Sequence, residues 1–147
     1  MIAAVKVADM REFLTDAGAT VDKVEVTKDG FHITASLGRE RHVWVEGMDC
    51  KGDGEAQACP EFSISARWTL ESAARATAAA RDISFAYTTV NTDGRNIELS
   101  RMDFIPDGVT RNHVRSAVAE FIELRSAAEN AIWPPAKSTR PPKTPAK

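Results

Sequence analysis

Hydrophobic residues recur with two spacings along this chain, and one spacing predicts helices while the other predicts strands. An amphipathic helix buries residues at i, i+3, i+4 and i+7, whereas a half-buried strand alternates apolar and polar positions. The helical spacing occurs first in Met10, Phe13, Leu14 and Ala17. Asp9 can cap the N-terminus of this stripe and Gly18 can end it, so we predict a helix that begins at Asp9 and stops before Gly18.

Four segments of alternating apolar and polar residues follow this helix. They span residues 23–27, 31–37, 42–46 and 62–68. In the second segment the alternation is strict and places Phe31, Ile33, Ala35 and Leu37 on one face. Asp29 and Gly30 favour a tight turn, residues 38–40 a second turn, and residues 47–61 a longer polar loop. Such runs predict an antiparallel meander with one buried face.

A dense run of alanines over residues 71–81 returns to helical character, because alanine is the strongest helix former. Thr69, with Ser72 three residues later, is the expected N-cap of this helix. Residues 85–90 then have strand character, and the sequence Asn-Thr-Asp-Gly at residues 91–94 favours a hairpin turn. This part of the chain therefore predicts a helix followed by the first strand of a hairpin.

The second strand of that hairpin begins with Ile97 and Leu99, but its apolar positions then change phase. Met102 and Phe104 lie one position out of step with the earlier pair. An extra residue in one strand produces such a shift, so we predict a β-bulge near residues 100–101.

The last predicted element is a long helix that begins after Thr110, a favourable N-cap, and ends at Trp133. Its apolar stripe consists of Val114, Ala117, Val118, Phe121, Leu124, Ala128 and Ile132. Charged residues, Arg125 among them, are expected on its other faces. In the order α-β-β-β-β-α-β-β-α, three helices and about six strands make an α+β fold with helices packed on an antiparallel sheet.

Composition divides the chain into one domain, residues 1–133, and a tail, residues 134–147. A length of 147 residues with 43% hydrophobic residues suits a single hydrophobic core. Five of the seven prolines and four of the 19 Lys and Arg residues stand in the tail, which has no Asp or Glu. This composition predicts a disordered Pro/Lys-rich tail, or else a basic arm that touches an acidic partner.

Charge and hydropathy bear on partners and location. A formal net charge of −2 gives the chain no electrostatic footprint for nucleic acid. No apolar stretch approaches the roughly 20 residues that span a bilayer, so membrane insertion is not expected. The first residues lack a secretory signal, so the sequence as it stands predicts a cytoplasmic protein. A true start upstream of Met1 would allow a periplasmic one.

Three histidines and one loop are the first candidates for chemistry. His32, His42 and His113 stand in no two-histidine motif, and a zinc site would need at least three converging ligands. The loop of residues 47–55 gathers acids and glycines but lacks the carboxylate spacing of a calcium-binding EF-hand. No nucleophile motif such as G-x-S-x-G occurs. We therefore predict no catalytic residues, no metal site and no cofactor.

Cys50 and Cys59, the two cysteines of the chain, flank the loop between two predicted strands. Pairing of those strands would bring the ends of the loop close enough for a disulfide. Closing a loop of about ten residues would stabilise the fold by about 2–3 kcal/mol. A reducing compartment would leave both residues as thiols, and a redox or metal role is the third alternative. A thioredoxin-like motif has a two-residue gap, which this pair does not.

Together these segments resemble the YbjN-like family of bacterial proteins, described as sensory-transduction regulators with a fold like that of type III secretion chaperones. The resemblance covers about residues 9–133. It rests on the opening helix Asp-Met-Arg-Glu-Phe-Leu-Thr-Asp-Ala-Gly, on the cysteine pair before Phe-Ser-Ile-Ser-Ala-Arg-Trp, and on residues 85–87, 93–99 and 108–110. Family members often carry Asn and Trp where this chain has Ala-Ala-Ala-Arg at residues 78–81. The resemblance implies a non-enzymatic binding or chaperone-like role.

We therefore expect a non-enzymatic protein-binding or regulatory module, chaperone-like, that binds another protein or a second copy of itself. The candidate interfaces are the alanine-rich helix of residues 71–81, with Ala74 and Ala78, and the sheet face or edge near Trp44, since aromatic residues anchor many interfaces. Alternatively, Trp44 and Trp68 belong to the core. Two other functions stay open: a cell-envelope accessory domain with a Cys50–Cys59 disulfide, and an enzyme with an unrecognised site, which would need a pocket of converging histidines or carboxylates.

Overall fold

Three α-helices and six β-strands make up the computed structural model, which describes residues 1–105 and 108–134. In chain order the elements are α1 Val7–Asp16, β1 Thr20–Thr27, β2 Gly30–Ser36, β3 His42–Met48, the short 3₁₀ helix η1 Gly54–Ala56, β4 Glu61–Thr69, α2 Ala73–Ala80, β5 Thr89–Asp93, β6 Asn96–Phe104 and α3 Arg111–Ile132. The predicted α+β class and order of elements are confirmed. The predicted tail, from residue 135 onward, lies outside the described residues.

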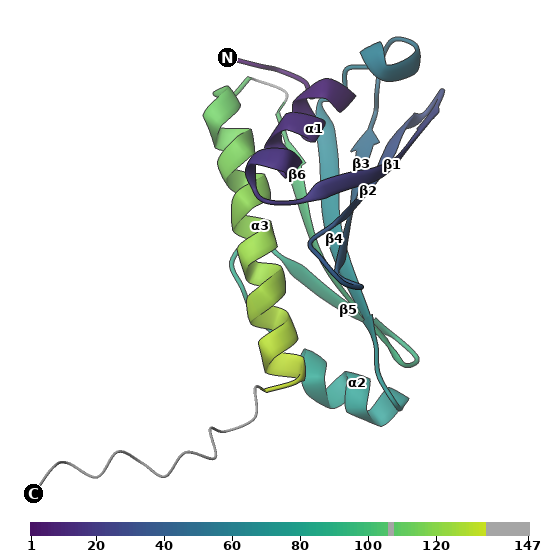
Figure 1. The fold of residues 1–147 in the computed structure, drawn as a ribbon, viewed down its shortest axis with the longest axis vertical. Helices are drawn as coiled ribbons and strands as arrows, with labels where there is room; N and C mark the ends of the chain where they lie inside the picture. Colours follow the sequence, from purple (N-terminus) through teal and green to yellow (C-terminus); the bar gives the residue numbers. More distant parts are fainter. Residues whose placement is uncertain (106–107, 135–147) are drawn as a thin grey trace, which may run out of the picture.

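The six strands form one antiparallel sheet in the order β1-β2-β3-β4-β6-β5. The first four strands pair in chain order, β1 with β2, β2 with β3 and β3 with β4, as in the predicted meander. The hairpin of β5 and β6 returns after α2, so that β6 pairs with β4 and β5 forms the edge. α1 and α3 lie on one face of the sheet, and α2 lies at its end (Figure 1). None of the helices in the described ranges is long and apolar enough to cross a bilayer.

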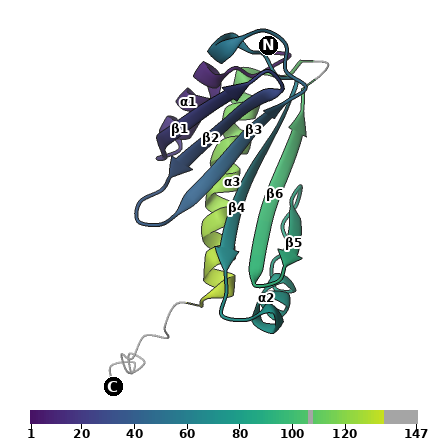
Figure 2. The ribbon, with the colours of Figure 1, turned by 90° about the vertical axis from the view of Figure 1, so that its right-hand side faces the viewer.

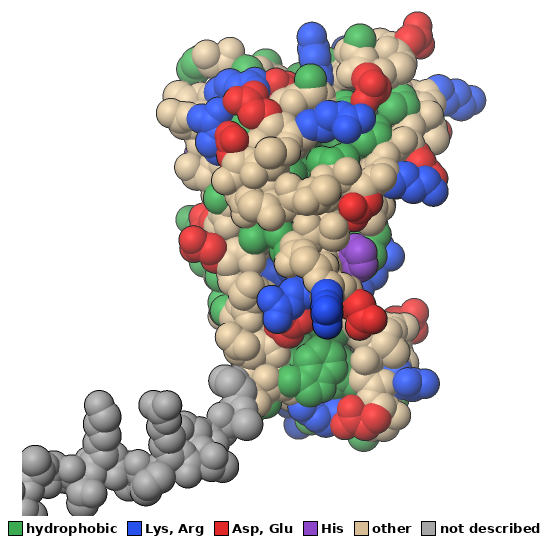
Figure 3. Space-filling view, in the orientation of Figure 1, with side chains coloured by type: hydrophobic (Ala, Val, Ile, Leu, Met, Phe, Trp, Pro, Cys, Tyr) green, Lys and Arg blue, Asp and Glu red, His purple; other side chains and the backbone are tan. Residues whose placement is uncertain are grey.

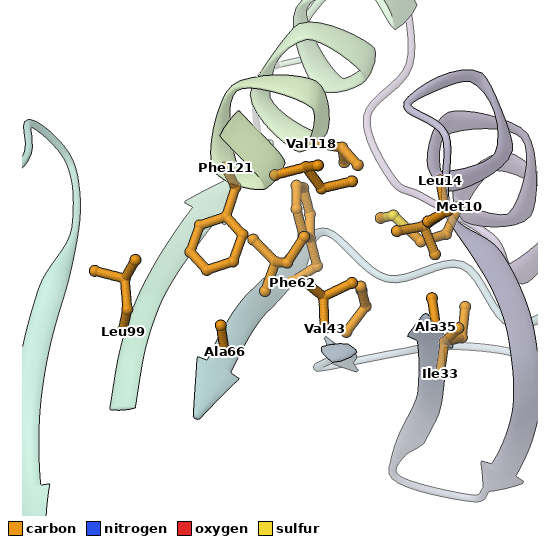
Figure 4. Close-up of a cluster of buried hydrophobic side chains, with 14 of the residues drawn as sticks. Met10, Leu14, Ile33, Ala35, Val43, Phe62, Ala66, Leu99, Val118 and Phe121 are labelled. Carbon is orange, nitrogen blue, oxygen red and sulfur yellow. The ribbon is translucent and has the colours of Figure 1, made fainter. Parts of the chain in front are cut away.

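The hydrophobic core fills the space between the sheet and the two helices that cover it. Met10 and Leu14 of α1 lie above β2, whereas Val118 and Phe121 of α3 lie above Phe62 of β4 (Figure 4). All five side chains are fully buried. Strands β2 and β4 bury every second residue, as the alternation predicts. Burial of one large apolar side chain stabilises a fold by about 1.5–3 kcal/mol, so these contacts hold the helices on this face.

α1 begins two residues before the predicted start, at Val7. Asp9 is not the N-cap but lies in the first turn, where its carboxylate accepts a hydrogen bond from the backbone N–H of Lys6 at 2.9 Å. This contact satisfies one of the N–H groups left free at a helix start. At the other end, Gly18 has a φ of +90°, which glycine adopts without steric cost, and it ends the helix as predicted.

The caps of α2 and α3 lie in the loops that precede them. Ser72, rather than Thr69, caps α2, and its Oγ accepts a hydrogen bond from the Arg75 backbone N–H at 3.1 Å. Thr69 instead continues β4, where it pairs with Asn96, so α2 begins later than predicted. Thr110 caps α3 as predicted, with its Oγ accepting from the backbone N–H three residues on at 3.1 Å.

A ladder of ion pairs joins α1 to α3. Arg111 contacts Asp9 and Glu12, and Arg115 contacts Glu12 at 3.0 Å. The Cζ atoms of these arginines lie 4.8 and 5.5 Å from the ring centroid of Phe13. Hydrogen bonds to Asp9 and Glu12 raise the pKa of Arg111 above its ordinary value. The ladder therefore fixes the N-terminal end of α3 against α1 by charged contacts as well as by packing.

The hairpin of β5 and β6 differs from the prediction in the position of its first strand. β5 is Thr89–Asp93 rather than residues 85–90, and the tight turn is at Gly94 and Arg95. Tyr87 has a φ of +63°, a conformation that a strand does not contain, so extended structure cannot run through it. The aromatic residues that suggest a strand there belong to a loop.

The predicted bulge near residues 100–101 is wrong. β6 pairs with β4 without interruption along its whole length, so the core position after Leu99 falls on Arg101, which is 8% exposed. Arg101 can occupy that position because Asp103 and Glu120 lie 2.8 and 3.6 Å from its guanidinium nitrogens. Met102 and Phe104 consequently lie on the opposite face of the sheet and are exposed.

Candidate functional site

The sheet face opposite α1 and α3 is not covered by any helix within the described residues (Figure 2). Strand register gives the composition of this surface, which we call the outer face. One row across β2, β3, β4 and β6 consists of Thr34, Trp44, Ser65 and Ser100, and the next of His32, Glu46, Ser63 and Met102. Short hydroxyl side chains thus occupy the middle of the outer face, and larger side chains stand around them.

Trp44 lies on the outer face and is half-buried. The guanidinium of Arg67 covers its ring, with the Cζ atom 5.0 Å from the ring centroid, and Arg67 Nε donates a hydrogen bond to Glu98 at 2.9 Å. Trp68, the next residue of β4, points the other way and is only 6% exposed. The structure therefore assigns Trp68 to the core and Trp44 to a surface, where its role as an interface residue stays a prediction.

Met102 and Phe104 are the large exposed apolar residues of the outer face, at 51% and 62% exposure. β5 reaches only as far as Ser100, so the edge of β6 beyond that residue has no strand partner on the β5 side within the described ranges. An unpaired strand edge and exposed apolar side chains are both features of surfaces that bind other proteins.

A notch opens in the sheet where β3 and β4 separate. Their pairing ends at Trp44 and Ser65, whereas β4 continues to Thr69. Figure 2 shows the two strands diverging here, with α3 behind them. A hollow of about 310 Å³ occupies this place, which we call the arginine notch. Its lining consists of Arg39, Glu40, Arg41, Arg67, Trp68, Thr69, Arg125, Glu129 and Trp133.

Arg125 is the most deeply buried charge of the arginine notch, at 2% exposure. Its Nε donates a hydrogen bond to the backbone carbonyl of His42 at 3.1 Å, and its Cζ lies 5.3 Å from the ring centroid of Trp68. Burial lowers the pKa of the Arg125 guanidinium, and the nearby Glu129 opposes this effect. An arginine stays protonated in proteins, so the notch contains a buried positive charge.

One carboxylate forms ion pairs with two guanidinium groups in the arginine notch. Glu129 lies 3.5 Å from Arg125 Nη1 and 3.2 Å from Arg41 Nε. Each guanidinium has five N–H donors, so donors outnumber acceptors there. Figure 3 shows Lys and Arg side chains interspersed with Asp and Glu in the lower part of the molecule, towards the end of α3. Such an excess of donors and positive charge suits the binding of an oxyanion.

The three histidines do not converge. His32 is exposed and lies 3.3 Å from Glu46 across the strands, whereas His42 stands beside Trp44 with ring centroids 5.9 Å apart. His113 is exposed in the first turn of α3. In residues 1–105 and 108–134 no group of three His, Cys, Asp or Glu side chains is placed to hold a metal ion.

Cys50 and Cys59 are joined by a disulfide in the structure, with Cα atoms 4.1 Å apart. The flanking strands β3 and β4 pair as the sequence predicts, which brings the ends of the loop together. Cys59 is fully buried, and its backbone exchanges two hydrogen bonds with Val5, so the bridge also fixes the segment before α1. This position gives the bridge a structural role, and its redox state in the cell stays a prediction.

Ala74 and Ala78 lie on the exposed side of α2, whereas Ala76 and Ala79 are buried. The helix is fixed to α3 by Arg75, which donates a hydrogen bond to the backbone carbonyl of the last residue of α3. The exposed side offers only small side chains at these two positions. Its role as an interface stays a prediction.

The arginine notch is the site that the sequence did not predict. The sequence places Arg125 on an exposed side of the last helix and Leu124 in the apolar stripe, but Arg125 is buried and Leu124 is half-buried. A signal was present, because Arg125 follows Phe121 by four residues and precedes Ala128 by three, which is the spacing of the buried stripe. Its partners, His42 and Trp68, come from distant segments.

Comparisons with known proteins identify the fold. No protein-family model matches the chain, and no curated protein matches it in sequence. An uncharacterised protein from Methanothermobacter thermautotrophicus superposes with a TM-score of 0.52 and 11% identity over 84% of this chain and 93% of that one. YbjN from E. coli, described as a candidate transcription regulator, superposes with a TM-score of 0.52 and 12% identity over 81% of this chain and 84% of that one. The chain therefore has a YbjN-like fold, as the sequence resemblance predicts.

Proposed function

We propose that this chain, with its YbjN-like fold, is a non-enzymatic protein-binding module with a regulatory, chaperone-like role, and that a partner protein covers the outer face. The observation that carries this proposal is the outer face itself, which no helix of the described residues covers and which presents Trp44, Met102 and Phe104. The description of YbjN as a candidate transcription regulator supports the regulatory part.

The outer face has the features that make association favourable. Exposed methionine and phenylalanine side chains gain free energy when a partner removes them from water, at about 25 cal/mol per Å². Arg67 already packs on the ring of Trp44, so a partner that binds there would cost little side-chain conformational entropy. The serines between them leave room for a partner's side chains and offer hydroxyl groups as donors and acceptors.

The titratable groups support a role without catalysis. Catalytic sites bring groups with perturbed pKa values together in one cleft. Here a hydrogen bond between Lys23 and Glu25 raises the pKa of the lysine and lowers that of the acid, and both side chains are exposed on β1. Arg111 is the first residue of α3, and Arg125 lies about four turns further along the helix. These perturbations belong to separate structural contacts.

A pull-down with matched variants tests the proposal. The bait is the full chain, and the outer-face variant is Met102→Lys/Phe104→Lys. The control Ala74→Lys/Ala78→Lys adds the same charge on α2. Quantitative mass spectrometry then identifies proteins recovered by the wild type, and each is purified and bound again. Light scattering of the purified chain over a range of concentrations asks whether the partner is a second copy.

The expected result is a partner that the outer-face variant loses and the α2 variant retains. Loss in the α2 variant alone would move the interface to α2. A strict monomer with no partner that binds again after purification would overturn the protein-binding proposal as a whole.

The Cys50–Cys59 disulfide favours a second candidate function, a cell-envelope accessory domain. Disulfides persist in oxidising compartments and are rare where thiols are kept reduced. Mass measurement with and without reductant, on protein taken from its native compartment, tests this alternative. An oxidised pair supports it, and two free thiols contradict it.

A further inference from the structure

We propose that the arginine notch binds a carboxylate carried by an extended segment of the partner protein. This inference rests on the proposed protein-binding function and adds the chemistry of the ligand and the place where it enters.

Unused hydrogen-bond donors point to an anionic ligand. Trp68 lines the notch and is 6% exposed, and its buried indole N–H has no hydrogen-bond partner within the described residues. Arg125 beside it donates one hydrogen bond to a backbone carbonyl and has a long contact with Glu129. A buried donor without a partner costs free energy, and an oxygen ligand that reaches these groups would recover that cost.

The charge of the notch favours an anion over a neutral ligand. Four arginines and two glutamates line it. One of these arginines, Arg67, also pairs with Glu98, which does not line the notch. Arg39 has no carboxylate within 4.0 Å in the described residues. Residues 1–133 contain more Asp and Glu than Lys and Arg, so the notch is a local positive charge on a domain of net negative charge. Electrostatics of this kind steers a partner to one place on a surface.

The open edge of β4 favours a peptide segment as the carrier of the anion. Beyond Ser65 the edge that faces β3 has no strand partner within the described residues, and the carbonyl of His42 accepts a hydrogen bond from Arg125 instead of from a neighbouring strand. An extended segment can add to such an edge by backbone hydrogen bonds. Trp68 and Trp133 supply apolar walls for its side chains. A free phosphate would use the arginines but neither the edge nor the walls.

Peptide pairs test the proposal by fluorescence. Trp44→Phe leaves Trp68 and Trp133 as the tryptophans of the chain, and both line the notch, so emission reports its occupation. The probes are an array of short extended peptides, each acidic peptide printed beside a twin with Asp replaced by Asn and Glu by Gln. Binding members are then titrated in solution. The variant Arg39→Gln/Arg41→Gln removes two exposed notch charges, and Arg11→Gln/Arg81→Gln removes the same charge elsewhere.

We expect acidic peptides to bind at least about tenfold more tightly than their amide twins, because charge-assisted hydrogen bonds are the strong ones. The notch variant should lose this preference and the control should keep it. Equal binding of the twins, or equal loss in both variants, would overturn the proposal. Displacement of the peptides by inorganic phosphate with the same emission change would make the notch a phosphate site instead. If no peptide binds while Met102→Lys/Phe104→Lys still loses the partner, the inference falls and the proposed function stands.

Discussion

Arg125 of α3 lies against the ring of Trp68 of β4, with 5.3 Å between the guanidinium carbon and the ring centroid. The same guanidinium donates a hydrogen bond to the carbonyl of His42 at 3.1 Å, so one buried cation contacts α3, β4 and the start of β3. Taking this charge out of water costs free energy, and the ring, the carbonyl and Glu129 offset the cost. These contacts of Arg125 therefore keep β3 and β4 apart at the arginine notch.

Replacement of Arg125 should separate packing from hydrogen bonding. Arg125→Ala removes the contact with Trp68 and the hydrogen bond to His42, and we expect a loss of about 2–4 kcal/mol in the free energy of unfolding. Arg125→Met refills most of the buried volume without the hydrogen bond, so the loss should be about 1 kcal/mol. Urea unfolding followed by circular dichroism measures both values. Equal losses would contradict the packing role of the side chain.

Reduction of the Cys50–Cys59 bridge should weaken the fold by about 2–3 kcal/mol, because the open loop gives the unfolded chain more conformations. Hydrogen exchange should also increase at Val5, whose backbone pairs with Cys59. Urea unfolding with and without reductant measures the first effect and mass spectrometry the second. Cys50→Ala is the control, since it cannot respond to reductant. An unchanged unfolding midpoint for the wild type would refute the structural role of the bridge.

Gly47 should not tolerate a side chain. A Cβ at this position would lie 2.5 Å from Phe31 Cε1 and 2.7 Å from Cys59 Sγ, both in the core. Core atoms would have to move, and such overpacking costs about 1–3 kcal/mol. We expect Gly47→Ala to lower the free energy of unfolding by this amount in a urea titration. Ser65→Ala on the outer face is the control and should stay within about 0.5 kcal/mol. Similar values for both would show that the core around Phe31 is looser than described.

The sequence predicts best those elements whose burial repeats at short range. β2 and β4 alternate without interruption because one of their faces packs against helices along the whole strand, so each pair of neighbouring residues carries the signal. The sequence left open whether Trp44 belongs to the core; in the structure its neighbours Val43 and Val45 are fully buried, and its ring lies on the outer face. The helix stripes and the Thr110 cap are local in the same sense.

Features that depend on residues far apart in the chain could not be predicted from the sequence. Arg101 takes a core position in β6 because its guanidinium pairs with Asp103 and with Glu120 of α3. The alternation of the strand puts Asp103 on the same face, but the sequence gives no spacing that connects Arg101 to Glu120. From the sequence alone, a polar residue at position 101 indicates that the apolar alternation changes phase, which predicts a bulge. The arginine notch depends on where β3 and β4 stop pairing, which follows from packing on α3 rather than from either strand.

Phe62 and Phe104 provide a direct test of the register between β4 and β6. Phe62 is fully buried on the helix-covered face, and Phe104 is 62% exposed on the outer face. We expect Phe62→Ala to cost about 3–5 kcal/mol and Phe104→Ala to stay within about 0.5 kcal/mol in urea unfolding. A bulge in β6 would turn Phe104 into the core, and both substitutions would then be costly. Because Phe104 contributes little to the fold, loss of a partner on its replacement would report on the interface itself.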